Sequence, residues 1–264
     1  NTITNRIALN EQLNQKLEET AQALYKHWFV DFEFPITKES CPELVSGFPE
    51  LVGKPYKSSG GKMVYNEELE KEIPEGWELG KIHQIVKYSK NRINVAELSI
   101  TNYVSTDNMN PNRAGIETAS KLPSANTVTK FNRGNILISN IRPYFKKIWI
   151  AEFEGGCSND VLCFENIEGI ETMFTYYILE ADAFFEYVMQ GAKGTKMPRG
   201  DKDWIMNYDL IIPNKDTMGM FKKVAEKLLD VSYERNKENI RLLTCSELLL
   251  AKMTKVEVEE EIIN

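Results

Sequence analysis

Ala21-Gln-Ala-Leu-Tyr-Lys-His-Trp-Phe-Val-Asp-Phe-Glu-Phe-Pro35 is the stretch around which the chain is organised. Its second half is dense in aromatic residues, and a proline closes it. Because proline lacks a backbone donor and clashes with the preceding helical turn, we predict that a helix runs into this aromatic cluster and ends at Pro35. This layout indicates a rigid rod that positions a recognition domain.

A regular apolar stripe extends upstream of the aromatic cluster. Asn10 falls on this stripe, and an asparagine at such a seam position sets register in coiled coils. We therefore predict a first long helix over residues 1–34. The stripe recurs at three- and four-residue steps and comprises Ile3, Ile7, Leu13, Leu17, Ala21, Leu24 and Trp28.

A second long helical pattern closes the chain. We predict a helix over residues 214–253, with Asp216 or Thr217 as its N-cap, and an acidic tail over residues 254–264. Neither long helix can bury its stripe alone, so the two pack antiparallel on each other or pair with helices of another subunit. The second stripe consists of Phe221, Val224, Leu228 and Val231, and continues at Ile240, Leu243, Glu247 and Leu250.

The part between the helices changes character at Trp77. Residues 35–76 are rich in proline and glycine and form a connector, whereas residues 77–213 form a compact domain dominated by short β-type runs. One helix, Thr172–Met189, interrupts these runs. We predict an α+β fold class: one globular mixed α/β domain flanked by two long helices that form an antiparallel coiled-coil-like rod. The predicted strands are residues 135–139, 147–151, 160–164 and 209–213.

The bulk properties exclude several classes of protein. With 264 residues, 42% of them hydrophobic, the chain has the composition of a soluble globular protein. No apolar run approaches the ~20 residues that span a bilayer and no signal peptide opens the chain, so we expect a cytoplasmic protein with no membrane partner. The first residue is Asn1, which indicates a trimmed start or a piece of a longer polypeptide. Free thiols and no metal site are expected, because no Cys-x-x-Cys spacing occurs among Cys41, Cys157, Cys163 and Cys245.

The charges are unevenly distributed along the chain. The net charge is −7, yet residues 121–150 contain basic residues and no acid, whereas residues 151–190 contain acids and no Lys or Arg. A protein with separated poles can bind a polyanion through one face. The alternative is that both runs are ordinary solvated surface.

Two segments have the composition of a DNA-binding surface. In the first, a strand end and a turn at Pro143 present Asn140, suited to adenine, beside cations suited to phosphate and guanine. In the second, glycines allow close approach to a backbone. An ordinary surface hairpin and a flexible loop are the alternatives. The candidate DNA-binding residues are Asn140, Arg142, Tyr144, Lys146 and Lys147, with Lys121 and Arg133 from the same basic run, and Lys193, Thr195, Lys196 and Arg199 from the second segment.

Catalytic signatures are missing from the sequence. There is no Gly-x-x-x-x-Gly-Lys-Ser/Thr phosphate loop, no Gly-x-Gly-x-x-Gly turn and no Asn-Pro-Pro-Tyr motif of amino-methylating enzymes. His27 lies at an aromatic helix end and His83 in a predicted strand, which disfavours a histidine-based triad. We predict no catalytic residues and no metal ligands in this chain.

Several pieces of the chain resemble the specificity subunit of type I restriction-modification systems. The most specific piece is Leu17-Glu-Glu-Thr-Ala-Gln-Ala-Leu-Tyr-Lys-His-Trp-Phe-Val-Asp-Phe-Glu-Phe-Pro35. The others, which occur in the same order, are Pro55-Tyr-Lys-Ser-Ser-Gly-Gly-Lys-Met63, Ile73-Pro-Glu-Gly-Trp77, Ile136-Leu-Ile-Ser-Asn-Ile-Arg-Pro-Tyr144 and Ile240-Arg-Leu-Leu-Thr-Cys-Ser-Glu-Leu-Leu-Leu-Ala-Lys-Met253.

The resemblance implies a non-catalytic role in sequence-specific DNA recognition. Such subunits carry two recognition domains separated by long helices, and each domain reads one half of a split double-stranded DNA target. The resemblance implies that residues 77–213 are a target-recognition domain, and one such domain between two helices looks like the C-terminal half of such a subunit, or a natural half-subunit that forms a homodimer. The resemblance implies docking of methyltransferase (M) subunits and indirect contact with restriction (R) subunits. No cofactor is expected in this chain; S-adenosylmethionine, ATP and Mg are expected in the partner subunits.

Two other classes of function stay open at this stage. A fragment of a DNA methyltransferase or nuclease would need a cofactor pocket, which the missing motifs disfavour. A coiled-coil protein-interaction adaptor would show no salt-dependent DNA affinity, and the basic run over residues 121–150 favours DNA over it.

Overall fold

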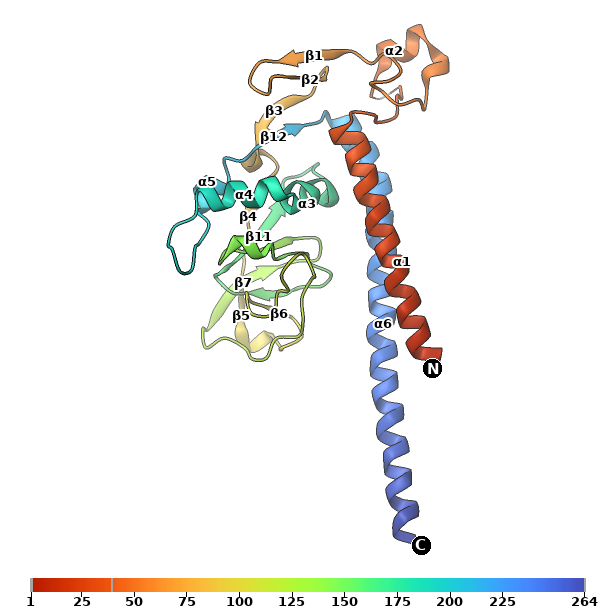
Figure 1. The fold of residues 1–264 in the computed structure, drawn as a ribbon, viewed down its shortest axis with the longest axis vertical. Helices are drawn as coiled ribbons and strands as arrows, with labels where there is room; N and C mark the ends of the chain where they lie inside the picture. Colours follow the sequence, from red (N-terminus) through yellow and green to blue (C-terminus); the bar gives the residue numbers. More distant parts are fainter. Residues whose placement is uncertain (1, 39, 264) are drawn as a thin grey trace. The chain divides into compact units, whose positions relative to one another are not determined.

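The computed structural model describes residues 2–38 and 40–263, and the side chains of residues 253–263 lie outside its described part. Two compact units make up the described chain: a helical unit of residues 2–26 and 222–263, and a second unit of residues 27–221 (Figure 1). The α+β fold class predicted from the sequence is confirmed. Within the described ranges, no helix is both long and apolar enough to cross a lipid bilayer.

The helical unit consists of helix α1 (Thr2–Tyr25) and the part of helix α6 (Lys215–Ile263) that follows Phe221. Arg6 pairs with Glu238 at 3.0 Å, and the Asn14 amide donates to Asn236 Oδ1 at 2.7 Å. Partner numbers fall along α6 as they rise along α1, so the two helices run antiparallel within one chain. The backbone of α6 continues to Ile263, through the segment that we predicted as an acidic tail. The N-cap predicted at Asp216 or Thr217 is wrong, because the helix begins at Lys215 and the Thr217 N–H donates to Asn214 Oδ1 at 2.9 Å.

The stripe predicted on α1 faces its partner. The stripe predicted on α6 is right at Phe221, which is buried, and wrong at most of its other positions. Asn10 and Ala21 are each 1% exposed, but Ile240 and Leu250 on α6 are 62% and 61% exposed. The buried α6 positions in this unit include Ala225, shifted by one residue around the helix from the predicted stripe. The shift follows from the polar contacts of the seam, because Asn10 donates to Glu238 Oε2 and Asn239 Oδ1, both at 2.8 Å.

The aromatic stretch leaves the helix earlier than the proline requires. α1 passes into one π-turn, η1 (Lys26–Val30), and Phe32 then takes a left-handed conformation with φ 62°. The Glu33 N–H donates to the His27 carbonyl at 2.8 Å, a capping bond that reaches back one residue further than the six-to-one bond of a Schellman cap. The helix predicted over residues 1–34 is therefore closed by this cap, ahead of Pro35.

The aromatic side chains that follow the helix form a core that joins the connector to the rest of the second unit. Phe29 packs against Phe174 and Phe221, each with ring centroids 4.8 Å apart. Phe34, 1% exposed, is stacked with Tyr56 at 4.5 Å and with Trp77 at 5.1 Å. The connector that carries these contacts contains α2 (Pro42–Gly47), η2 (Pro49–Leu51) and a hairpin of β1 (Met63–Asn66) and β2 (Lys71–Pro74).

Two four-stranded sheets form the centre of the second unit. One has the order β5 (Arg92–Asn94), β7 (Thr127–Phe131), β10 (Gly155–Cys157) and β6 (Tyr103–Val104). The other has the order β4 (Val86–Tyr88), β11 (Val161–Asn166), β8 (Ile136–Ser139) and β9 (Ile148–Ile150). All four predicted strands occur, the last as β12 (Asp209–Ile212), which pairs antiparallel with β3 (Glu78–Lys81). The remaining short elements are η3 (Ile82–Gln84), η4 (Val95–Glu97), η5 (Pro143–Phe145) and α5 (Lys202–Ile205). The strand predicted at His83 is wrong, because this residue lies in η3.

The predicted helix Thr172–Met189 is divided in two. α3 (Thr172–Glu180) and α4 (Asp182–Gln190) meet at Ala181, whose backbone is extended with φ −56° and ψ 143°. The break gives α4 a new direction and places Asp182 in its first turn. Both helices bury aromatic residues, which is why their combined pattern resembled one buried helix.

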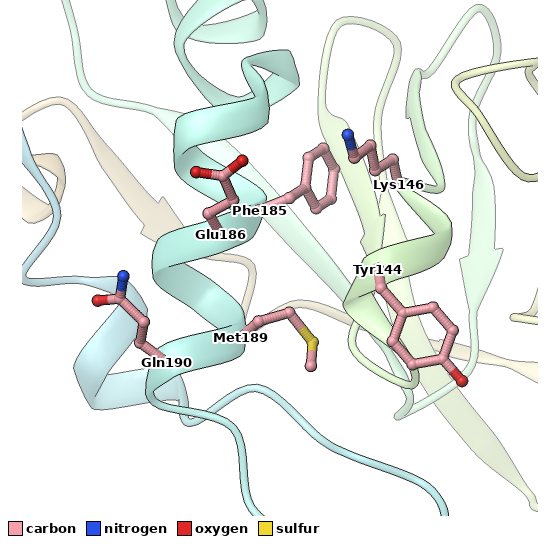
Figure 2. Close-up of a pocket in the computed structure, with 6 residues that line it drawn as sticks. All are labelled: Tyr144, Lys146, Phe185, Glu186, Met189 and Gln190. Atoms are coloured by element: carbon pink, nitrogen blue, oxygen red, sulfur yellow. The ribbon is translucent and has the colours of Figure 1, made fainter.

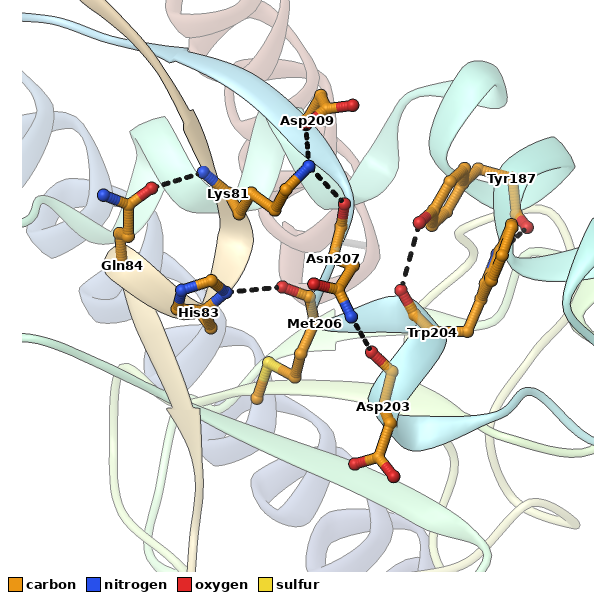
Figure 3. A network of polar contacts seen from close by, with 9 residues as sticks. All are labelled: Lys81, His83, Gln84, Tyr187, Asp203, Trp204, Met206, Asn207 and Asp209. Carbon is orange, nitrogen blue, oxygen red and sulfur yellow. Dashed lines mark hydrogen bonds and ion pairs between the residues drawn. The ribbon is translucent and has the colours of Figure 1, made fainter.

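A polar network fastens the first and last strands of the domain (Figure 3). Lys81 on β3 pairs with Asp209 on β12, and the His83 ring bonds the Met206 carbonyl at 3.0 Å. Tyr187 of α4 stacks on Trp204 at 4.9 Å, so α4 is fixed to the segment that leads into β12.

Candidate nucleic-acid interface

The turn that follows strand β8 is held in an unusual backbone conformation. Arg142 and Lys146, with φ 51° and 50°, flank η5, and Pro143 supplies the fixed φ of its first position. Left-handed backbone costs a non-glycine residue roughly 1–2 kcal/mol, so it persists only where surrounding contacts hold it. The Arg142 N–H donates to the Pro198 carbonyl at 2.8 Å, and the Phe145 N–H donates to the Arg142 carbonyl at 3.0 Å.

A second strained segment supports this turn from the other side. Asn112 and Arg113 also have left-handed backbones, with φ 55° and 64°. Their N–H groups donate to the carbonyls of Phe145 at 2.8 Å and Lys146 at 3.0 Å. Sequence reasoning missed both residues, although an Asn-Pro-Asn-Arg run is typical of turns and pointed to this conformation. The turn is therefore braced by backbone bonds on two sides.

The structure brings the two predicted DNA-binding segments together. The segment 193–199 closes on itself, because the N–H groups of Lys193 and Arg199 each donate to the other's carbonyl at 2.9 Å. Its base lies beside the end of β8 through the isolated bridge of Ile141 with Arg199 and the bond from the Gly200 N–H to the Asn140 carbonyl at 3.2 Å. We call the surface formed by residues 140–147 and 193–200 the two-loop surface.

Two of the predicted residues lie elsewhere. Arg133 precedes β8, at the opposite end of that strand from Asn140. Lys121 is exposed and lines a pocket of about 400 Å³ together with Asp160, whose carboxylate pairs with Arg199 at 2.7 Å. Lys121 therefore flanks the two-loop surface, whereas Arg133 is separated from it by the length of β8.

The separate charge poles predicted from the sequence are wrong for the folded two-loop surface. Lys146 pairs with Asp182 at 2.7 Å, Lys193 pairs with Asp201 at 2.5 Å, and Arg199 pairs with Asp160. Acids from residues 151–203 thus fold back onto the cations of both loops. The poles merge because β11 pairs with β8 and α4 packs against η5, which the order of residues along the chain does not reveal.

Asp182 ties the turn to helix α4 and to the supporting segment. Its carboxylate accepts from Lys146 and from Arg113, and Arg113 also donates to the Glu180 carbonyl at the end of α3. The hydrogen bonds from Lys146 and then Arg113 lower the pKa of the Asp182 carboxyl to about 2. Lys147 is likewise engaged, because its ammonium group donates to the Thr106 carbonyl at 2.7 Å.

The side chains suited to base contact differ in exposure. Asn140 is 8% exposed and its Oδ1 lies directly against Gly200, so its amide is enclosed between the two loops. Tyr144 and Phe145 are 47% and 37% exposed. The adenine contact predicted for Asn140 stays a prediction. The Asn140 Oδ1 atom is buried without a hydrogen-bond partner among the described residues, and the bond to the second loop is made by the Asn140 backbone carbonyl.

An apolar groove lies between the turn and helix α4. It has a volume of about 390 Å³ and is lined by Tyr144, Lys146, Phe185, Glu186, Met189 and Gln190. Figure 2 shows Tyr144 and Lys146 facing Phe185 and Met189 of α4 across this space, with the tyrosine hydroxyl directed away from the helix. The groove gives the two-loop surface an apolar edge.

Among the described residues, no group of three or more His, Cys, Asp or Glu side chains is arranged to hold a metal ion. Cys41, Cys157 and Cys163 are buried free thiols, and Cys245 is an exposed one. The two-loop surface combines hydrogen-bond donors, exposed aromatic rings and a braced backbone, and these features are suited to binding a ligand.

Comparison with known proteins identifies relatives of one kind. Over 74 residues the chain is 36% identical to the type I restriction enzyme MjaIX specificity subunit of Methanocaldococcus jannaschii, a match covering 28% of this chain and 12% of that protein. Over 201 residues it is 24% identical to the type I restriction enzyme EcoDI specificity subunit of Escherichia coli, covering 73% of this chain and 44% of that protein. No family model matches the sequence.

Nearly the whole of this chain is also similar to parts of solved specificity-subunit structures. A type I restriction-modification S subunit from M. genitalium superimposes with a TM-score of 0.48 at 12% identity, over 94% of this chain and 57% of that one. The HsdS subunit from Thermoanaerobacter tengcongensis gives a TM-score of 0.39 at 11% identity, over 93% and 52%.

The predicted resemblance to specificity subunits of type I restriction enzymes is confirmed by these sequence matches. The matched segments span less than half the length of each curated relative.

Proposed function

We propose that this chain recognises one half of a bipartite double-stranded DNA target within a type I restriction-modification complex. The observation that carries the proposal is the two-loop surface, which occurs in a chain similar to specificity subunits. Specificity subunits of these systems are non-catalytic, and catalysis lies in other subunits. The proposal therefore assigns S-adenosylmethionine, ATP and Mg to partner polypeptides in the cytoplasm, and DNA reading to this chain.

The charges of the surface set how strongly DNA would be held. Lys146, Lys193 and Arg199 are paired with carboxylates, so a phosphate must compete with those partners. Arg142, Lys196 and the flanking Lys121 have no acidic partner among the described residues. Each phosphate neutralised contributes about 0.9 to the slope of log affinity against log salt, so three contacts give a slope of about −3. This is a modest electrostatic term, and specificity then depends on base contacts and shape.

Docking of methyltransferase subunits is the second element of the proposal, and the helical unit supports it. Leu243 and Leu248 to Leu250 of α6 are between 49% and 61% exposed, although large aliphatic side chains in a helix pair are commonly buried. A double variant, Leu243→Glu with Leu250→Glu, should abolish co-purification with co-expressed methyltransferase subunits. Arg241→Glu, also on the exposed face of α6, should leave co-purification intact; equal loss in both variants would remove this surface from the proposal.

Selection from a random duplex library tests the DNA-binding role. The full chain, with its methyltransferase subunits, is equilibrated with the library, and the bound duplexes are sequenced over several rounds. We expect one enriched half-site, with an affinity that falls as salt is raised. An adaptor protein would enrich no sequence, and a methyltransferase or nuclease fragment would bind S-adenosylmethionine or cut the duplex in isolation.

A further inference from the structure

Arg142 differs from the other cations of the two-loop surface. Lys146, Lys193 and Arg199 each have a carboxylate partner, and the Lys147 ammonium group donates to a carbonyl. Arg142 has no ion-pair partner among the described residues, and its Nε atom is enclosed without a hydrogen bond. The enclosed Nε lies out of reach of an external ligand and fixes the stem of the side chain, so the terminal amino groups of the guanidinium, which have no acceptor among the described residues, are the ones that can bind a ligand.

The backbone of Arg142 is fixed on both sides. Its N–H donates to the Pro198 carbonyl, and its carbonyl accepts from the Phe145 N–H. Its neighbour Pro143 has a fixed φ, and the far end of the turn is held by Asn112 and Arg113. A left-handed residue held in this way projects its side chain from a defined point, which suits contact with one particular atom pair.

Base edges and phosphates require different side chains. A phosphate is satisfied by a mobile ammonium group, as at the exposed loop tip residue Lys196. A guanine presents N7 and O6 as an acceptor pair in the major groove, and the planar guanidinium fork matches that pair with two parallel bonds. A fixed arginine whose donors are not already bound to protein acceptors fits the second task.

We propose that Arg142 reads a guanine through the major groove, and that the ion-paired residues around it hold the turn in place. This inference rests on the proposed function, because it needs a DNA target. Lys196 then contributes to affinity for any sequence, and Asn140, enclosed against Gly200, positions the two loops relative to each other.

Parallel selections with wild-type chain and an Arg142→Gln variant test the assignment. The wild type should enrich a half-site containing a guanine that the variant no longer requires. Glutamine pairs with the N7 and N6 of adenine, so the variant should prefer adenine at that position. Discrimination for guanine there should fall by about 5- to 150-fold, while the other positions of the half-site keep their preferences.

Two further variants separate the possible results. Arg142→Lys keeps the charge but lacks the planar fork, so it should weaken the guanine preference while retaining the salt slope, which guards against a folding defect in Arg142→Gln. Lys196→Gln should reduce the salt slope by about 1 and leave the enriched sequence unchanged. If wild type enriches no sequence, the proposed function fails. If wild type and both Arg142 variants enrich the same half-site with the same discrimination, the function stands and the role of Arg142 is overturned.

Discussion

Replacing Phe34 by alanine should destabilise the second unit more than any surface substitution in the connector. The ring is 1% exposed and is stacked between Tyr56 and Trp77. Truncating a buried aromatic residue to alanine costs about 3–5 kcal/mol through lost burial and the cavity that remains. Each aromatic pair adds about 0.5–1.5 kcal/mol beyond burial, so the upper part of that range, about 4–5 kcal/mol, is expected.

Urea unfolding followed by tryptophan fluorescence measures this effect, because Trp77 is in direct contact with Phe34. With a slope of about 2 kcal/mol per molar urea, the loss corresponds to a midpoint lower by about 2 M at an unchanged slope. The free energy of unfolding of an ordinary domain is about 5–15 kcal/mol. If the value for wild type lies near the lower end, the variant is already unfolded without urea; if it lies higher, the variant keeps a folded baseline that can be measured.

Phe48→Ala is the matched control for this experiment. Phe48 lies in the same connector but is 55% exposed, so its truncation should change the free energy of unfolding by less than about 0.5 kcal/mol. If Phe34→Ala lowers the midpoint no further than Phe48→Ala does, the aromatic stack is not what joins the connector to the domain.

Three further predictions concern the seam, the turn and the meeting point of the loops. Asn10→Leu should preserve or raise the melting temperature of the helix pair while relaxing its register, measured by cysteine cross-linking between α1 and α6; a large drop in melting temperature would contradict a register role. The pKa of Asp182, about 2, lies below its unfolded value of about 3.9, so its contribution is present above about pH 4 and lost as pH falls towards 2. Amide exchange in the turn should rise over that window in wild type, and an Asp182→Asn variant should already exchange faster at neutral pH. Gly200→Ala places a Cβ 2.7 Å from Asn140 Oδ1 and should destabilise the domain by about 1–3 kcal/mol, whereas nothing lies within 4 Å of a Cβ at Gly47, so thermal melting of Gly47→Ala should match wild type.

Local pattern was sufficient to predict the elements of this fold. The stripe from Ile3 to Leu24 predicted α1 and the face it buries, and the apolar runs that became β8 and β11 were long enough to stand out. The residue at which the first helix ends was harder to predict, because that end depends on whether Phe32 adopts a left-handed conformation. Only the tertiary demand to bury Phe29 and Phe34 decides that conformation.

Charge and surface were the least predictable features. The basic run over residues 121–150 is free of acids along the chain, but Asp160 and Asp182 reach its cations and their neighbours once the strands pair. Lys193 and Arg199 lie some 50 residues beyond the turn at Arg142, and only the β8 register and the bridge at Ile141 make them neighbours. Most of the stripe predicted on α6 was wrong for a related reason. Polar contacts with α1, and not the amount of apolar surface, determine which face of α6 is buried.

Hydrogen exchange on the full chain, with and without its selected duplex, probes the DNA surface itself. We expect the amides of residues 141–147 and 193–199 to become protected on binding, while those of the β1–β2 hairpin exchange as before. Unchanged exchange in both loops, with protection confined to other segments of the second unit, would show that DNA is read elsewhere.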